Sequence, residues 1–276
     1  MTGSDLDSVP TSGERPTSRP RRIRILDVPV DAVRDMPAAL DQVSTFLNGD
    51  RTRVILAVNP EKVMAARRSP GLLRILDSSD LLVPDGIGVV LAARLLGLAR
   101  MRRVPGSELM PELCRLAART GHGVFLYGAK PEIVERAARL LQEAYPGLRI
   151  VGHQHGYVPE EEMDALIERI NASGAQILFV ALGSPRQEQW LDRYRHRLRV
   201  KVCQGVGGTF DAICGHPPRA PALFRSLGLE WFYRLVTQPT RARRQLALPV
   251  FAAQVLGQMV RRRLMPGGAT TPPAPS

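Results

Sequence analysis

An aspartate between two apolar segments is the first residue whose position could serve chemistry. Asp85 lies in "LLVPDGIGVVLAARLLG" (81–97), where one apolar run stops at Pro84-Asp85-Gly86 and a second begins at once. A carboxylate at such a junction can take the proton of a reacting hydroxyl. It can equally cap the helix that follows or form an Asp-Gly turn. The neighbours of Asp85 must decide between these interpretations.

A second set of residues is suited to bind phosphate. Arg100, Arg102 and Arg103 stand in "RMRRVPGSELM" (100–110), a loop that leads into a helix expected to begin near Gly106-Ser107. Guanidinium groups and the backbone N–H groups of a helix N-terminus both favour an anionic ligand. The alternative is a basic loop that is merely solvated.

From Arg22 onward the sequence alternates short apolar runs with helical segments. The strands and helices that this pattern predicts must position these residues. Strands are expected at 22–28, 53–59, 80–85, 123–128, 148–153, 176–183 and 200–205. Helices are expected at 36–48, from Pro60 onward, and at 86–97, 107–120, 130–145, 160–173 and 186–198. This alternation predicts an α/β fold, a mainly parallel sheet with helices on both faces. The helix at 86–97 is apolar all round and is therefore expected to be buried.

The carboxyl ends of parallel strands share one edge of the sheet, and ligands bind outside that edge. The residues expected there are Asn59, Asp85, Gly128, Gly183 and Gly205. Asn59 lies next to Asp85 if their strands are neighbours, although it could equally be an ordinary helix cap. Glycines after a strand, here also Gly207 and Gly208, let the backbone approach a ligand closely.

Several cofactor and metal motifs are absent from the sequence. "GVGG" (205–208) is not GxGxxG, and no acidic residue follows at the distance typical of a dinucleotide site. GxxxxGK[ST], GxSxG and HExxH are absent as well, and "HQH" (153–155) has no third ligand in register. No carboxylate pair with DxD spacing lies at the predicted edge. We therefore expect neither a bound metal nor a cofactor.

The two ends of the chain differ from the region between them. Residues 1–20 and 266–276 are rich in Pro, Ser, Thr and Gly and are expected to be disordered. Residues 21–215 carry the alternating pattern, and 44% of the 276 residues are apolar, enough for one large core. Neither a signal peptide nor a membrane-spanning run is expected. The three cysteines, Cys114, Cys203 and Cys214, fit buried free thiols in a reducing cytosol.

The region 216–265 is basic. From Gly215 onward the chain has nine arginines, no lysine and one acidic residue, which accounts for +8 of the net charge of +12. Such an excess favours nucleic acid, an acidic membrane or phosphate as partner. Within it, 245–260 is a run of sixteen uncharged residues between arginine clusters, too short to span a bilayer but able to lie in its interface. Packing of this helix on the core or on a partner subunit is the alternative.

Taken in order, eight blocks resemble the WecG/TagA/CpsF glycosyltransferases, family 26. They are "NPEKV", "LLVPDGIGVVLAARLLG", "RVPGSELM", "FLYGAKPEIVERAA", "PGLRIVGHQHGY", "ILFVALGSPRQEQW", "GVGGTFD" and "GLEWFYRL". The resemblance covers 22–244. It implies a Rossmann-like fold and an inverting, metal-independent transfer of a sugar, such as N-acetylmannosamine, from a UDP donor to an undecaprenyl-diphosphate-linked sugar. It also implies a cytoplasmic enzyme, peripheral on the inner face of the membrane, that serves cell-surface polysaccharide or teichoic acid biosynthesis.

The resemblance also implies roles for single positions. Asp85 in "PDG" matches the proposed catalytic base. The positions that match the substrate pocket are Asn59, Arg103, Gly106, Ser107, Gln187, Glu188, Gly207 and Gly208. Arg234, Arg241 and Arg244 match arginines of a C-terminal appendage that, in the family, closes over the pocket and touches the donor diphosphate. Ala57 replaces a threonine of some members and Glu108 an aspartate of others, and both changes bear on which sugar is bound.

Two other classes of protein compete with the glycosyltransferase. The basic tail favours a nucleic-acid-binding protein, but its aromatic residues are clumped (Phe224, Trp231, Phe232, Tyr233 and Phe251) instead of interleaved with basic residues as a stacking platform. A sugar-nucleotide oxidoreductase is disfavoured because the dinucleotide motif is absent. We therefore expect no nucleic acid partner, while a homo-oligomer is left open.

Overall fold

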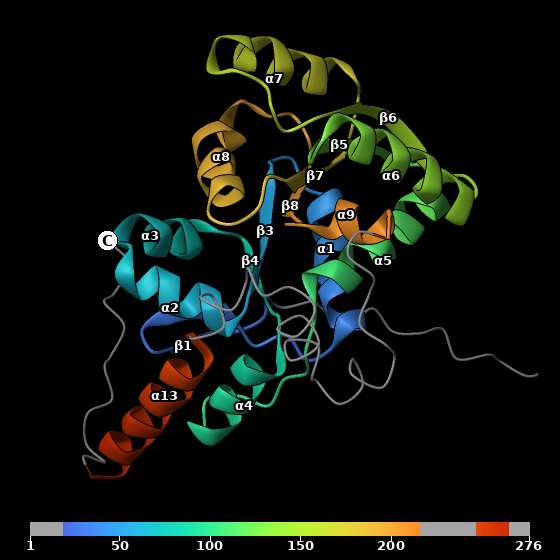
Figure 1. Ribbon diagram of the computed structural model, residues 1–276. Coiled ribbons are helices and arrows are strands. Elements are labelled where there is room, and N and C mark those ends of the chain that lie inside the picture. Colours follow the sequence, from blue (N-terminus) through green and yellow to red (C-terminus); the bar gives the residue numbers. More distant parts are fainter. Residues whose placement is uncertain (1–18, 216–246, 265–276) are drawn as a thin grey trace, which may run out of the picture.

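The computed structural model describes residues 19–215 and 247–264 (Figure 1). Its main sheet has the strand order β4-β3-β8-β7-β5-β6, and every neighbouring pair is parallel. The strands are β3 (Arg53–Val58), β4 (Leu81–Pro84), β5 (Gly123–Gly128), β6 (Arg149–Gln154), β7 (Ile177–Ala181) and β8 (Val202–Gly205). The predicted α/β, Rossmann-like fold is confirmed. Residues 1–18, 216–246 and 265–276, which include nearly all of the predicted tails and most of the predicted appendage, lie outside the described residues.

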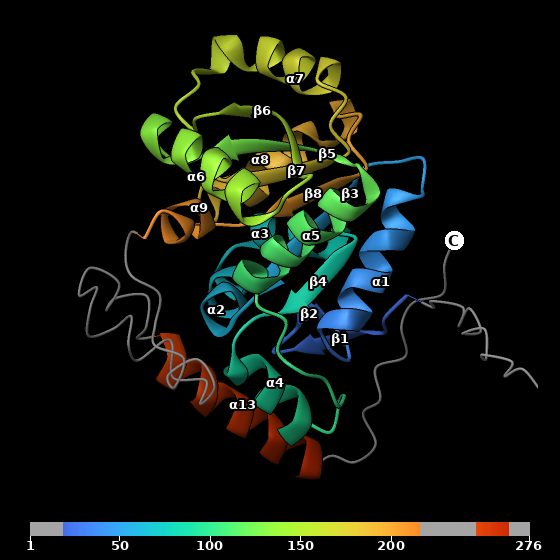
Figure 2. The same ribbon diagram turned by 90° about the vertical axis from the view of Figure 1, so that its right-hand side faces the viewer.

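Helices cover both faces of this sheet (Figure 2). One face carries α1 (Met36–Leu47), α5 (Gly106–Thr120), α6 (Pro131–Ala144) and α9 (Thr209–Ile213). The other carries α2 (Pro60–Arg68), α3 (Pro70–Ser78), α7 (Met163–Ala172) and α8 (Arg186–Tyr194), with 3-10 turns at Glu160–Glu162 and Arg195–Arg197. Along β3, Val54 and Leu56 join the core on this second face, and Ile55 joins the core on the first. Because both sides of the strand are buried, its sequence is an unbroken apolar run.

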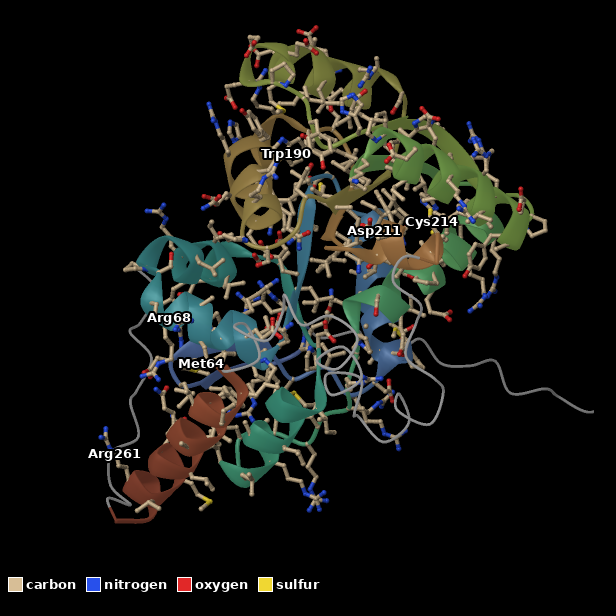
Figure 3. All side chains as sticks on the ribbon, viewed as in Figure 1. Met64, Arg68, Trp190, Asp211, Cys214 and Arg261 are labelled. Atoms are coloured by element: carbon tan, nitrogen blue, oxygen red, sulfur yellow. The ribbon has the colours of Figure 1, made fainter. Side chains whose placement is uncertain are left out.

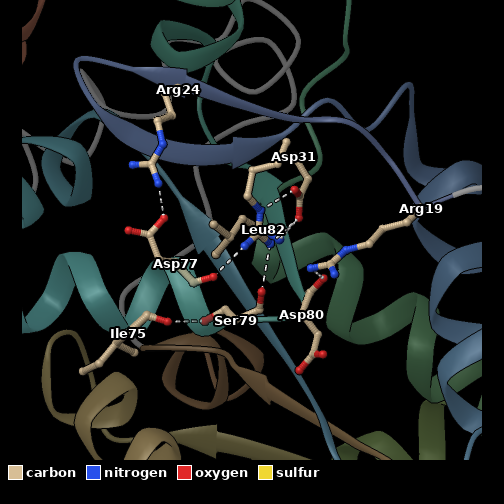
Figure 4. A network of polar contacts seen from close by, with 9 residues as sticks. Arg19, Arg24, Asp31, Ile75, Asp77, Ser79, Asp80 and Leu82 are labelled. Carbon is tan, nitrogen blue, oxygen red and sulfur yellow. Dashed lines mark hydrogen bonds and ion pairs between the residues drawn. The ribbon is translucent and has the colours of Figure 1, made fainter. Parts of the chain in front are cut away.

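The single strand expected at 22–28 is instead a small antiparallel hairpin outside the main sheet, β1 (Arg22–Ile25) and β2 (Val28–Asp31). Its two turn residues, Leu26 and Asp27, have φ of 50° and 67°, which the sequence did not signal because Asn-Gly and Asp-Gly are the usual pairs there. The buried Asp31 carboxylate accepts the N–H of Leu82 at 2.8 Å and the Nε of Arg22 at 2.8 Å. Further contacts from Arg19 and Arg24 tie this end of the chain to the region around β4 (Figure 4).

The helix expected at 86–97 is present as α4 (Ile87–Leu95), but it is not buried all round. Val89, Ala92 and Ala93 face the core, whereas Ile87, Leu91 and Leu95 form an exposed row on the opposite side, with 36%, 48% and 52% exposure. The expectation was wrong because periodicity identifies the buried face of a helix only when polar residues mark the other face. An uncovered apolar row therefore begins two residues after Asp85.

Residues 247–260 of the apolar run at 245–260 belong to α13 (Ala247–Leu264), which packs against α2 and α4 at the same end of the molecule (Figures 1 and 2). Phe251 and Val255 are buried in this contact, while Leu256 and Val260 are half exposed. Within the described ranges, no helix combines the length and the apolar character needed to cross a bilayer. Of the two sequence-based interpretations, packing on the core is observed, and the outward apolar side chains keep interfacial binding open.

The three cysteines are all buried, and none forms a disulfide. Burial raises the pKa of Cys114 to about 12 and also raises the pKa of Cys203 and of Cys214. Since the thiolate is the reactive form, we expect iodoacetamide at pH 8 to leave Cys114 and Cys203 unmodified in the folded protein and to label all three in guanidinium. Peptide mass mapping checks this, and rapid labelling of native Cys114 would show that its surroundings are misplaced.

Candidate active site

Asp85 and Asn59 lie side by side where β4 and β3 end. Pro84 and Val58 are partners in the parallel register, and the next residue, Asp85, donates its backbone N–H to the carbonyl O of Val58 at 2.9 Å. The prediction that the two polar residues follow neighbouring strands is confirmed. The sheet therefore brings a carboxylate and an amide to one corner of its carboxyl edge.

The two side chains differ in their local role. Asn59 Oδ1 accepts the N–H of Lys62 at 2.8 Å and so caps α2, which is the ordinary role that the sequence left open. By contrast, α4 begins after Gly86, an N-cap residue without a side chain and with φ of 91°. Asp85 immediately precedes this N-cap residue and is half buried. Its role as a base stays a prediction.

The arginine loop returns to this corner. Val104 donates its N–H to the carbonyl O of Pro84 at 2.8 Å, which holds the neighbouring Arg103 beside the end of β4. Arg103 Nη2 contacts Glu108 Oε1 at 3.3 Å, on the first turn of α5. α5 starts at Gly106, and its N-cap residue, Pro105, makes no side-chain hydrogen bond to the first turn. A guanidinium and the positive end of a helix therefore stand together near Asp85.

The start of α5 is fixed against the sheet. A Cβ added to Gly106 would lie 3.1 Å from the Cβ of Ala57, so a larger residue at either position would push the helix outward. Gln204 Nε2, on β8, donates to the Gly106 carbonyl O at 3.0 Å. Ala57, the departure noted from the sequence, therefore contacts the helix start that carries Gly106 and Ser107.

A topological switch point lies between β3 and β8 (Figure 1). After β3 the chain enters α2 on one face of the sheet, and after β8 it enters α9 on the other. In such folds, the position at the carboxyl edge where loops leave adjacent strands toward opposite faces is where ligands bind. Asn59 follows β3 at this position, and Gly207, with φ of 59°, and Gly208 follow β8.

Gln187 and Glu188, at the start of α8, are buried beneath the loop that follows β8. Gln187 Oε1 accepts the N–H of Gly207 at 2.8 Å. Glu188 Oε1 accepts from Gln187 Nε2 at 3.2 Å and pairs with Lys62 Nζ at 2.7 Å. The Glu188 and Lys62 side chains are only 0% and 8% exposed, so the pair lies inside the protein. Contact of Gln187 or Glu188 with a substrate stays a prediction.

Lys62 is the site residue that sequence reasoning did not select. Its position after Asn59-Pro60-Glu61 is that of an ordinary helix residue, and its partner Glu188 is 126 residues away. One weak signal existed: Lys62, Lys130 and Lys201 are the three lysines among 38 lysines and arginines. A lysine in so arginine-rich a chain marks a place where a compact charge fits better than a guanidinium fork.

The other predicted residues are only partly placed. Arg234, Arg241 and Arg244 lie outside the described residues. Among residues 19–215 and 247–264, no three His, Cys, Asp or Glu side chains are grouped in a way that could hold a metal ion. Eight of the predicted positions and Asp85 do come together around the carboxyl ends of β3, β4 and β8. They are Asn59, Arg103, Gly106, Ser107, Gln187, Glu188, Gly207 and Gly208.

Comparison with known proteins shows which family the chain belongs to. Residues 23–265 match the model of the glycosyl transferase WecG/TagA/CpsF family. The chain is also similar to a protein of Bacillus spizizenii named N-acetylglucosaminyldiphosphoundecaprenol N-acetyl-beta-D-mannosaminyltransferase. The two are 37% identical over 213 residues, 77% of this chain and 82% of the relative. With a family match that spans the Asp85 corner, the switch point and α13, the chain belongs to the WecG/TagA/CpsF family and is a glycosyltransferase.

Proposed function

We propose that this glycosyltransferase moves a sugar of the N-acetylmannosamine type from a UDP donor to a sugar linked to undecaprenyl diphosphate, with inversion and without a metal. The name of the Bacillus spizizenii relative supports the transferred sugar and the lipid-linked acceptor. The observation that carries the proposal is the corner at which Asp85, Arg103 and the start of α5 meet beside a switch point. Such a corner offers a base and an anion site next to each other at the carboxyl edge of the sheet.

Asp85 acts as the general base in this proposal. The acceptor hydroxyl oxygen attacks the anomeric carbon of the donor sugar while the bond from that carbon to the UDP oxygen breaks, and the hydroxyl proton passes to the Asp85 carboxylate. Attack from the face opposite UDP inverts the anomeric centre. General-base assistance of this kind is typically worth about 10² to 10⁴ in rate.

The leaving UDP gains negative charge as the bond breaks, and fixed positive groups must stabilise it. Arg103 and the first turn of α5, with Gly106 and Ser107, supply such groups near Asp85. Gly207 and Gly208 let the loop after β8 approach the diphosphate closely. We assign the rest of the charge stabilisation to Arg234, Arg241 and Arg244 of the appendage, 216–265.

Peripheral attachment to the inner, cytoplasmic face of the membrane is part of the same proposal, because a lipid-linked acceptor must be met at a bilayer. The exposed row of α4 and the outer side of α13 supply apolar side chains for that contact. Arg261 projects from α13 at this end of the molecule (Figure 3), and Arg67 on α2 lines the same surface pocket as Arg261. Basic and apolar side chains together favour the interface of an anionic membrane.

The function is tested by offering the purified protein a panel of UDP-sugars together with a short polyprenyl-diphosphate N-acetylglucosamine. With UDP-N-acetylmannosamine we expect UDP release and a product heavier by one N-acetylhexosamine residue. Release of UDP that does not depend on the acceptor, or transfer only from other nucleotides, would contradict the proposal.

Metal dependence is a separate prediction. Because arginines and a helix N-terminus are proposed to stabilise the leaving UDP, we expect the transfer rate to remain within about twofold when EDTA is in excess, since no metal ion is asked to supply that charge stabilisation. The rate is measured with and without added Mg²⁺ or Mn²⁺. A strict requirement for either ion would refute the metal-free mechanism.

A further inference from the structure

A chain of polar contacts crosses the switch point beneath the two loops that flank it. Asn59 Oδ1 accepts the N–H of Lys62 at 2.8 Å, and Lys62 Nζ pairs with Glu188 Oε1 at 2.7 Å. Gln187 Nε2 donates to the same oxygen at 3.2 Å, and Gln187 Oε1 accepts the N–H of Gly207 at 2.8 Å. The loop after β3 is thereby connected to the loop after β8 through side chains of α2 and α8.

The Lys62–Glu188 ion pair stands at the centre of these polar contacts, and a contribution to the free energy of unfolding does not explain it. Lys62 and Glu188 are both buried, and Glu188 Oε2 has no hydrogen-bond partner among the described residues. The free-energy cost of removing two charges from water is about as large as the attraction between them. Replacing such a pair by apolar side chains of similar volume is often neutral or stabilising. A buried pair with one unsatisfied oxygen is therefore better explained by the neighbouring groups that it positions.

Gln187 is the side chain through which the ion pair contacts the loop after β8. A Cβ added to Gly205 would lie 2.8 Å from Gln187 Nε2 and 3.0 Å from Leu56 Cδ2, so the amide is packed directly on the end of β8. The amide is bonded to Glu188 on one side and to the backbone of Gly207 on the other. Lys62 therefore acts on the loop through a side chain that has little room to turn.

We propose that Lys62 is a positioning residue for the loop after β8. Through Glu188 and Gln187 it holds the backbone at Gly207 in the conformation that receives the nucleoside diphosphate of the donor. The substrate named in this inference rests on the proposed function, whereas the contacts that lead from Lys62 to Gly207 do not depend on it.

The test compares a single and a double substitution. Lys62→Met leaves Glu188 buried without its partner, so the melting temperature falls. Lys62→Met with Glu188→Met removes the pair altogether, and the melting temperature returns toward that of the wild type. We expect kcat/KM for the donor to fall by about 10²-fold in both variants, mainly through KM, because misplacement of a binding group by about 1 Å has that effect.

A matched control lies near the amino end of β4, away from the carboxyl ends of the strands that carry the site. Arg22→Met likewise removes the partner of a buried carboxylate, Asp31, whose contact with Arg22 Nε is 2.8 Å. We expect a lower melting temperature and an unchanged KM for the donor. Recovery of kcat/KM together with stability in the double variant would overturn the positioning role. So would a loss in Lys62→Met no larger than that in Arg22→Met.

Hydrogen exchange separates this inference from the proposed function, because it needs no substrate. The Gly207 amide, bonded to Gln187, should exchange faster in the double variant than in the wild type, while amides in the centre of β3 keep their protection. Unchanged protection at 206–208 would show that the pair does not hold the loop. If the wild type transfers no sugar, the function fails, and this measurement alone decides the role of Lys62.

Discussion

Asp85→Asn is expected to lower the rate of sugar transfer by about 10² to 10⁴-fold, the range that general-base assistance supplies. Asparagine keeps the size of the side chain and most of its hydrogen bonds but cannot take the acceptor proton. The fold should keep its stability, because Asp85 is only half buried and the asparagine side chain has the same size and can still accept hydrogen bonds. The measurement is UDP release with a soluble lipid-linked acceptor, together with the melting temperature.

Two outcomes would count against the base assignment. A fully active Asp85→Asn enzyme needs no base at this position, and a variant that unfolds reports a structural role instead. Asp41→Asn on the exposed side of α1 is the matched control, with the same chemical change far from the corner, and it should keep the full rate. Binding of UDP by the Asp85 variant should also persist, because its donor contacts are assigned to other residues.

The corner around Asp85 could be predicted because it follows from local rules. Each apolar strand is visible in the sequence, and in a parallel sheet the residue after each strand must come to the same edge. Asn59 and Asp85 were therefore found from their positions after two strands that proved to be neighbours. The helix that follows the arginine loop was expected at 107–120, and α5 starts one residue earlier, at Gly106.

The role of Lys62 and the order of the strands could not be predicted, because they depend on contacts that no local sequence pattern encodes. Lys62 meets Glu188 across 126 residues, and nothing near either residue in the sequence points to the other. The order of the strands, which puts β8 beside β3 and so creates the switch point, is likewise a property of the whole sheet. The exposed row of α4 escaped prediction because its outward side chains are apolar like its inward ones.

That exposed row carries the second large prediction, loss of membrane binding. Leu91 and Leu95 on α4 and Leu256 and Val260 on α13 are between 48% and 52% exposed. Leaving such side chains in water has a free-energy cost that insertion into a bilayer interface would remove. Deleting α13 would be a poor test, because Phe251 and Val255 are part of the core. Substituting the exposed side chains leaves that packing in place.

We therefore expect a variant with glutamine at these four positions to bind anionic vesicles of phosphatidylglycerol about 10² to 10³-fold more weakly, from about 1 kcal/mol lost per side chain. Its melting temperature should stay close to that of the wild type, since the four side chains point outward. Ile87 is left unchanged because it adjoins Gly86 and Asp85. Co-sedimentation with vesicles measures the binding, and high salt should weaken what the arginines contribute.

The matched control is Tyr157→Gln, which removes an apolar side chain that is 64% exposed between β6 and α7, at the other end of the molecule (Figure 1). It should leave vesicle binding unchanged. The four-residue variant should also keep transfer to a short, soluble acceptor while losing transfer to an acceptor embedded in vesicles, because only the second reaction needs the enzyme at the bilayer. If the variant bound vesicles as tightly as the wild type, α4 and α13 would not be the membrane contact, and attachment would have to rest on the arginines alone.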